Sequence, residues 1–117
     1  MAKKEGKEDQ VFSIIKNIYF RLDKDYEKLE ALCKTDAEKK QLKNDYVIAR
    51  ANYRKSMNLD FSVNDKAVKD MIKEFKKLDE QIKKDIENMD KISAVFKIIS
   101  EAVKMASSII VVVMNLL

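Results

Sequence analysis

The C-terminal segment of this chain, from Met105 to Leu117 (MASSIIVVVMNLL), has no charged residue, although 38% of the whole sequence is charged. A helix that is apolar on all sides cannot lie on the outside of a soluble monomer, because about half of its surface would face water without a polar stripe. The segment must therefore be covered by the rest of its own chain, by a partner protein or by lipid.

The length and composition predict one helical domain. A chain of 117 residues is long enough for a single hydrophobic core and too short for two. It contains one Gly and no Pro, so it has few points at which a helix is forced to end. We expect an all-α fold, an antiparallel helical bundle of three to four long helices. The bundle should span residues 10–117, after a disordered charged N-terminus over 1–9.

Apolar residues spaced by three and four predict where the helices lie. The first is expected over about 10–33, where the spacing runs through Val11, Ile15, Ile18, Leu22, Tyr26, Leu29 and Cys33. The second, over about 36–57, follows a capping box formed by Thr35 and Glu38. A third, over about 64–89, follows a polar interruption in which Ser62 and Asp65 form another candidate capping box.

The first two helices can be aligned as an antiparallel hairpin, in which facing residues have numbers with a constant sum. The pair Tyr26 and Tyr46 has the same sum as the pair Tyr19 and Tyr53. We therefore expect each pair to lie in one layer, with the rings between the helices and the hydroxyl groups at the edge.

The end of the third helix is open to two interpretations. Asn or Asp between residues 88 and 93 could cap a fourth helix over about 91–117, but neither Gly nor Pro enforces a break there. With a break, four segments of similar length suit a four-helix bundle. Without one, helices three and four are one continuous rod of about 80 Å, half of which extends beyond the hairpin and is free to oligomerise. We expect the break and keep the continuous helix as the alternative.

The residues that carry most enzyme chemistry are missing. The chain has no His, and therefore lacks the commonest general base and metal ligand. Asp23, Asp25 and Glu27 resemble the start of a calcium loop, but Lys28 and Lys34 replace the Gly and Glu that such a loop needs at its sixth and twelfth positions. The sequence therefore predicts a non-enzymatic protein with no catalytic residue, no cofactor and no metal site.

The charge balance argues against a nucleic-acid partner. The 24 basic and 20 acidic residues give a net charge of +4 and are interspersed almost everywhere. One basic stripe, formed by Lys39, Lys43, Arg50 and Arg54, could follow phosphates. With four members and Asp45 nearby, we interpret the stripe as a solvated helix face or a set of ion pairs between helices.

The N-terminal region does not resemble a cleavable signal peptide. Lys16 and Arg21 interrupt the first apolar stretch, so no apolar segment of the required length follows the charged N-terminus. We expect a cytoplasmic protein, with export without a signal peptide and membrane association left open.

The apolar C-terminal helix is the strongest functional candidate, as a core helix, a partner interface or a membrane segment. We expect a protein–protein interaction module that self-assembles as a homo-oligomer or binds a helical partner by coiled-coil packing of this helix. The expected interface residues are Ile99, Val103, Ala106, Ile109, Ile110, Val113, Leu116 and Leu117. The alternative is a membrane-active or membrane-associated protein that inserts the segment. A span of bilayer length would reach back over Lys97, Glu101 and Lys104, each of which costs about 2 to 3 kcal/mol at mid-membrane.

Overall fold

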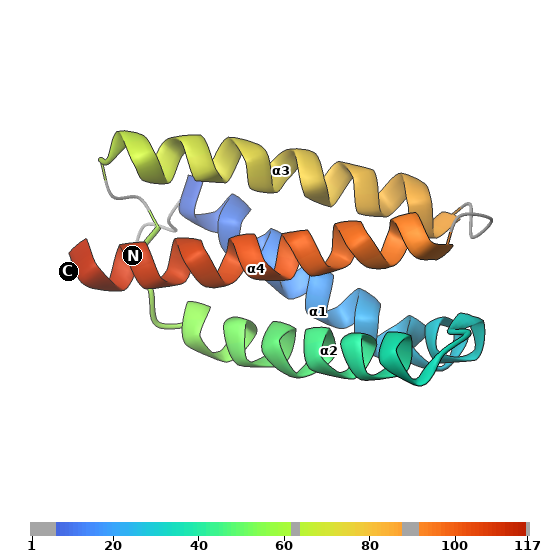
Figure 1. Cartoon of the computed structure of the whole chain (residues 1–117). Helices are drawn as coiled ribbons and strands as arrows, with labels where there is room; N and C mark the ends of the chain where they lie inside the picture. The colour runs from blue at the N-terminus through green and yellow to red at the C-terminus, as the bar shows by residue number, and fades with distance from the viewer. Residues whose placement is uncertain (1–6, 62–63, 88–91, 117) are drawn as a thin grey trace.

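A computed structural model describes residues 7–61, 64–87 and 92–116, which form four α-helices and their connections (Figure 1). The helices are α1 (Lys7–Leu32), α2 (Asp36–Ser56), α3 (Lys66–Glu87) and α4 (Ile92–Leu116). Helix α1 begins three residues earlier than predicted, and the rest of the predicted disordered N-terminus lies outside the described residues. The all-α bundle is confirmed.

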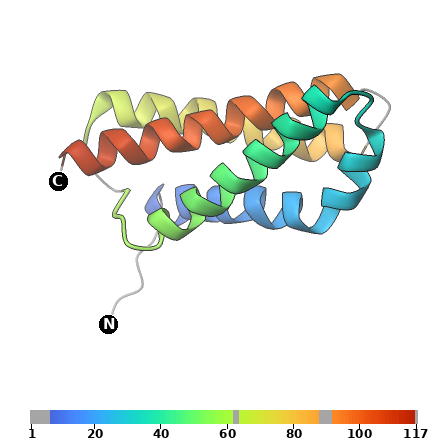
Figure 2. The ribbon, with the colours of Figure 1, turned by 60° about the horizontal axis from the view of Figure 1, so that its bottom comes forward.

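The four helices form two antiparallel hairpins that pack together. Helix α1 lies against α2, and α3 lies against α4 along its length (Figures 1 and 2). The continuous-helix alternative is therefore wrong, although the reversal itself, over 88–91, lies outside the described residues. Helix α4 also packs against α2, runs in the same direction, and touches α1, so it is in contact with all three other helices.

The start of α2 is capped as the sequence predicts. The backbone N–H of Glu38 donates to the Thr35 hydroxyl at 3.1 Å. In return, the Glu38 carboxylate accepts from the backbone N–H of Lys34 at 2.6 Å. Two N–H groups that the helix itself cannot pair are satisfied in this way, which explains the sharp turn between α1 and α2.

The start of α3 differs from the prediction. Asp65, expected as the distal member of a capping box, is itself the cap, since its carboxylate accepts from the backbone N–H of Val68 at 3.0 Å. Its carbonyl oxygen accepts the first helical hydrogen bond, from Lys69 at 3.0 Å. Asp is as good an N-cap as Ser, so the cap lies three residues after the predicted one and the helix begins at Lys66, two residues later than predicted. Ser62, the predicted cap, lies outside the described residues.

The predicted tyrosine layers are confirmed. The ring centroids of Tyr19 and Tyr53 lie 5.5 Å apart, and those of Tyr26 and Tyr46 lie 5.2 Å apart. Phe12 adds a stacked ring at 5.8 Å from Tyr53. The rings lie along the α1–α2 groove and are partly exposed, so this hairpin is joined by aromatic contacts near its surface as well as by the core.

The hydrophobic core is centred on α4. Helices α1 and α3 contribute mainly aliphatic residues with Phe75, the α2–α3 connection contributes Phe61, and α2 contributes only Leu42 and Ala49 as buried apolar residues. The remaining buried positions of α2 are Asp45, Asn52 and Ser56. Three of the five buried positions of α2 are therefore polar, and Tyr46 and Tyr53 pack against the edge of the core beside them.

Candidate partner-binding surface

Most of the predicted interface residues face the core of their own chain. Six of the eight are buried in the structure: Ile99, Val103, Ala106, Ile109, Ile110 and Val113. Leu116 is 49% exposed, and Leu117 lies outside the described residues. On this side α4 is a core helix, as one of the three interpretations of the C-terminal segment expected. Only the opposite side of α4 is accessible to a partner.

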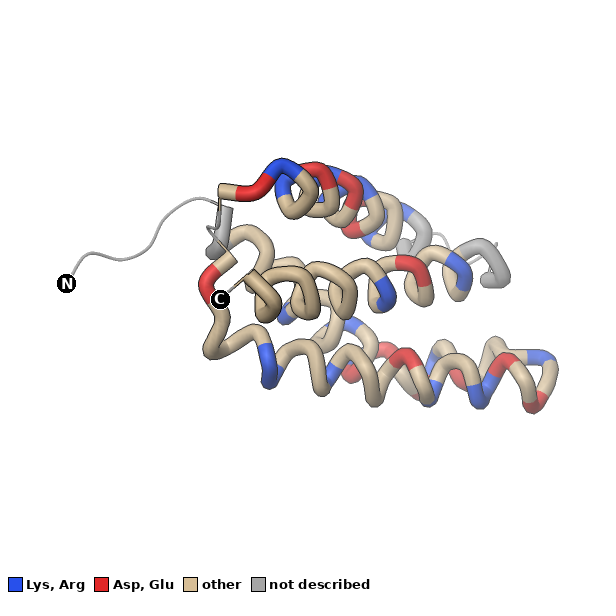
Figure 3. The backbone as a smooth tube through the Cα atoms, turned by 60° about the vertical axis from the view of Figure 1, so that its left-hand side comes forward, with Lys and Arg blue, Asp and Glu red and all other residues tan. Residues whose placement is uncertain are grey.

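The accessible side of α4 is apolar at its C-terminal end. Val111 is 55% exposed and Met114 is 53% exposed, and because they are three positions apart they share one side of the helix. Leu116, in the last turn, is also exposed but lies on another side of the helix. These three residues are called the α4 end below. Figure 3 shows that the last turns of α4 carry no Lys, Arg, Asp or Glu.

The sequence prediction missed Val111 and Met114 because it followed the heptad positions of the apolar stripe and added only Ile109 and Leu116 from the positions beside them. In the structure that stripe faces inward, and Val111 and Met114 occupy the positions between its members. Their signal in the sequence was the absence of any charged residue after Lys104, since the outward side of a soluble helix is ordinarily polar.

A polar seam joins α2 to α4. The carboxylate of Asp45 accepts one hydrogen bond from the Ser100 hydroxyl at 2.6 Å and another from the Gln41 amide at 3.0 Å. Asp45 is 2% exposed, and burial raises the pKa of its carboxyl group above the ordinary value, while the two hydrogen bonds act in the opposite direction.

The seam repeats two helical turns further along. The Asn52 amide donates to the carbonyl oxygen of Val103 at 3.3 Å, and the Ser107 hydroxyl lies 3.3 Å from the Asn52 amide oxygen. In both layers the two residue numbers differ by 55, which is the register of two parallel helices. That register brings the exposed Met57, just after α2, to the level of Val111 and Val112.

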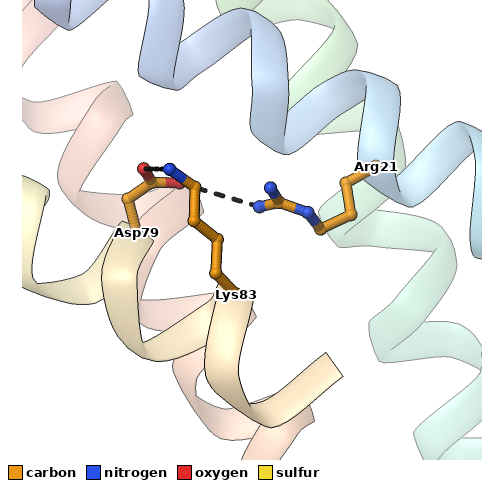
Figure 4. A network of polar contacts seen from close by, with 3 residues as sticks. All are labelled: Arg21, Asp79 and Lys83. Atoms are coloured by element: carbon orange, nitrogen blue, oxygen red, sulfur yellow. Dashed lines mark ion pairs between the residues drawn. The ribbon is translucent and has the colours of Figure 1, made fainter. Parts of the chain in front are cut away.

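An ion-pair network joins α1 to α3 (Figure 4). A guanidinium nitrogen of Arg21 lies 3.7 Å from one carboxylate oxygen of Asp79, and the ammonium group of Lys83 lies 3.4 Å from the other. Asp79 is buried, and neither Arg21 Nη1 nor Asp79 Oδ1 has a hydrogen-bond partner. The network compensates a buried charge and shows no geometry of a catalytic pair.

The four residues of the predicted basic stripe lie at the surface of α2, where Arg50 is half-buried. Arg50 lies with its guanidinium 5.7 Å from the ring of Tyr46, a cation–π contact, while Lys39, Lys43 and Arg54 are exposed. The hydroxyl of Tyr46 donates to Asp23 at 2.7 Å, and this hydrogen bond is the main cause that raises the pKa of Tyr46 to about 12. Asp23, the first residue of the calcium-like sequence, is thus used within the α1–α2 hairpin.

Three further observations describe the chemistry of the chain. The thiol of Cys33 points to the carbonyl oxygen of Leu29 at 3.3 Å, and burial raises its pKa, which reduces the reactive thiolate. Within residues 7–61, 64–87 and 92–116, no group of three or more Cys, Asp or Glu side chains is arranged to hold a metal ion. In the same ranges, none of the helices combines the length and apolar character needed to cross a membrane.

No protein-family model matches the chain, and neither the comparison with curated proteins nor that with solved structures gives a match.

Proposed function

We propose that the protein is a non-catalytic helical module that binds protein, either a second copy of itself or another helical chain, through the α4 end. The observation that carries the proposal is the exposure of Val111, Met114 and Leu116 on an uncharged stretch of helix. One exposed apolar residue is ordinary on a protein surface, but Val111 and Met114 are neighbours on one side of the helix, in a segment where no residue is charged. Such a pair favours contact with another apolar surface, and the exposed Leu116 extends the apolar surface around the end of the helix.

The surroundings of the α4 end support a docking role. Helix α4 is held along its inner side by the core and by the polar seam, so its outer side is presented on a rigid element. Met57 lies at the same level of the bundle, and methionine side chains adapt readily to the shape of a partner. A surface of this kind suits helix-against-helix packing, in which residues three and four apart enter the partner's groove.

The proposal is tested with a pair of double variants. Val111→Asp/Met114→Asp places two charges on the α4 end, and Val47→Asp/Ile48→Asp places two charges on similarly exposed apolar residues of α2. Mass by light scattering over a range of concentrations should show an assembly for the wild type and the α2 variant. The α4 variant should have the mass of one chain and an unchanged helical circular dichroism spectrum.

The outcomes separate the possible partners. A wild type that is monomeric at every concentration would rule out self-association. Photo-crosslinking from position 114 in a cell extract then tests for another protein, and the absence of a protein adduct would remove the rest of the proposal. Flotation of the wild type with liposomes that is lost in the α4 variant would instead identify lipid as the partner and contradict the proposal.

A further inference from the structure

The side of α4 that faces α2 continues past the end of α2. Ser100 and Ser107, seven positions apart, both make hydrogen bonds to α2, so this line of α4 faces α2. Met114 is the next residue on the line, and the register of 55 places it beyond Ser56, the last residue of α2. A partner that covers Met114 therefore also meets the surface along which α2 and α4 run side by side (Figure 1).

The α2 border of this surface carries an apolar side chain and then an ammonium group. The Gln41 amide donates to the Ser100 hydroxyl of α4 at 3.2 Å, so the line of α2 that begins at Gln41 borders α4. Ile48 and Lys55 follow Gln41 on this line at intervals of seven, and both are exposed.

The α4 border carries the same two kinds of side chain in the opposite order. Lys104 and Val111 are exposed and lie four positions after Ser100 and Ser107, beside the line that faces α2. Burial raises the pKa of Asp45, and its hydrogen bonds and the charge of Lys104 act in the opposite direction. An effect of Lys104 on Asp45 of α2 agrees with a position of its ammonium group on the α2 side of α4.

The register places each apolar side chain beside an ammonium group of the other helix. Because facing residue numbers differ by 55, Ile48 lies within one residue of the level of Lys104, and Lys55 within one residue of the level of Val111. The two levels are about 10 Å apart along the bundle. These four residues are called the α2–α4 strip below.

Exposed acidic residues do not balance the strip. From Lys39 to Leu59 the sequence has six Lys or Arg, and its one acidic residue, Asp45, is buried. Helix α4 has no acidic residue after Glu101. Among the carboxylates of residues 7–61, 64–87 and 92–116, none lies within ion-pair distance of Lys55 or Lys104.

This combination of charge and apolar surface favours one kind of partner. In a symmetric dimer the same surface lies on both subunits, so the strip would meet the ammonium groups of a second strip. An amphipathic helix with Glu or Asp on both flanks of its apolar side instead offers an apolar contact and an opposite charge at each level. The complementary partner is therefore an acidic helix.

We propose that the α4 end and the α2–α4 strip together bind an amphipathic helix of another protein, whose apolar side is flanked by carboxylates. Its apolar side would cover Ile48, Val111 and Met114, and its carboxylates would lie beside Lys55 and Lys104. This role rests on the proposed function, because the helix uses the same end of α4 and competes there with a second copy.

The test uses two synthetic amphipathic peptides of about three heptads with the same leucine side, one with Glu and one with Lys at every flanking position. Binding of each peptide to the full chain is measured by calorimetry. We expect the Glu peptide to bind the wild type at least about tenfold more tightly than the Lys peptide at low salt. This preference should shrink as salt is added, because the ammonium groups are exposed.

Two variants with the same change in net charge locate the preference. Lys55→Glu/Lys104→Gln removes both ammonium groups of the strip without placing a second carboxylate beside Asp45. Lys43→Glu/Lys39→Gln changes two exposed lysines of the basic stripe of α2. Each variant has a formal net charge of +1 in place of +4, since Glu lowers the charge by 2 and Gln by 1.

The strip variant should bind the Glu peptide at least about tenfold more weakly than the wild type does, and the basic-stripe variant within about twofold. Helical circular dichroism and thermal melting check that each bundle is intact. Lys55→Glu alone, which leaves Lys104 in place, should weaken binding at least about threefold and serves if the double variant does not fold. Equal losses in the two double variants would show a general charge effect and overturn the proposal.

Val111→Asp/Met114→Asp separates this proposal from the proposed function. If both peptides bind the wild type equally and this variant weakens both, the α4 end binds helices regardless of charge, so the proposed function stands and the acidic partner is overturned. If this variant leaves both affinities unchanged, the peptides bind elsewhere and the acidic partner is overturned as well. The proposed function is then decided by its own measurements of mass and crosslinking.

The remaining outcomes identify the other partners. Excess Glu peptide should reduce any assembly of the wild type to one chain in light scattering, and an assembly that persists would overturn the proposal in favour of a second copy. If neither peptide binds the wild type, the acidic partner is overturned. Vesicles of phosphatidylglycerol that bind the wild type but not the strip variant would in that case identify anionic lipid as the partner.

Discussion

Asp45 of α2 accepts a 2.6 Å hydrogen bond from Ser100 of α4 in a position where Asp45 is 2% exposed. A carboxylate in such a place loses most of its hydration, and the hydrogen bonds from Ser100 and Gln41 replace only part of it. The contact therefore joins two parallel helices through a carboxyl group whose charged form is made less favourable by burial. Several properties of the bundle follow from this and related buried polar groups.

Asp45→Asn should stabilise the protein at pH 7 by on the order of 1 kcal/mol. Burial raises the pKa of Asp45 in the folded state above its ordinary 3.8, so the stability associated with the protonated form is complete below that value and is lost as the pH rises through the folded pKa. The neutral amide can still accept from Gln41 and donate to Ser100. Urea unfolding should show that the gain shrinks as the pH falls towards 4, and a variant less stable than wild type at pH 7 would contradict the assignment.

Asn52→Asp should destabilise the protein by at least about 2 kcal/mol at neutral pH. The new carboxylate would face the carbonyl oxygen of Val103, which now accepts from the Asn52 amide at 3.3 Å, and could not donate to it. Asn44→Asp, at an exposed position of the same helix, is the matched control and should change stability by less than about 0.5 kcal/mol. Equal effects of the two substitutions in urea unfolding would mean that Asn52 is not held in the seam.

Arg21→Met should cost about 2 kcal/mol or more, because it leaves the buried Asp79 with Lys83 alone. The double variant Arg21→Met/Asp79→Leu should recover most of this loss, since it removes both charges and leaves apolar side chains of similar size. Thermal melting of the wild type and of these two variants measures the difference. A double variant no more stable than Arg21→Met would show that Asp79 is not compensated by Arg21.

Tyr53→Ala should cost more stability than Tyr26→Ala, about 2 against about 1 kcal/mol. The ring of Tyr53 lies within 5.8 Å of the rings of Phe12, Tyr19 and Phe20, whereas Tyr26 contacts the ring of Tyr46. Both rings are partly exposed, which keeps each loss below that of a fully buried tyrosine. Denaturant unfolding of the two variants gives the order, and the reverse order would disprove the ring arrangement.

Asp23→Ala should lower the pKa of Tyr46 from about 12 towards the ordinary 10, because the hydrogen bond to Asp23 is the main cause of the increase. The ultraviolet absorbance of tyrosinate, followed during an alkaline titration, reports the change. In the wild type a late step with a pKa of about 12 belongs to Tyr46, and in the variant this late step should move to lower pH. An unchanged late step would place the hydrogen bond elsewhere.

Much of the secondary structure is a local property of this sequence and could be predicted from it. The spacing of apolar residues by three and four predicts α1 to α3 within a few residues, because a helix repeats every 3.6 residues. The cap at Thr35 and the pairing of Tyr19 with Tyr53 follow from short-range geometry and a tight turn. The start of α3 was misplaced because Ser62 and Asp65 are both good caps, and only the chain's path selects between them.

Which elements bury the apolar C-terminal helix, and on which side, was decided by the tertiary structure alone. An uncharged segment shows that some surface must cover it, but the covering side depends on contacts between residues far apart in the chain. Here α3, α2 and α1 bury the heptad residues of α4, the seam of Asp45 and Asn52 sets its register against α2, and Val111 and Met114 stay exposed. The hydrophobic effect favours burial of apolar surface but does not specify which side of a helix is buried. The composition of the segment therefore determines only that part of it must be removed from water. The packing of the other helices determines which side remains free for a partner.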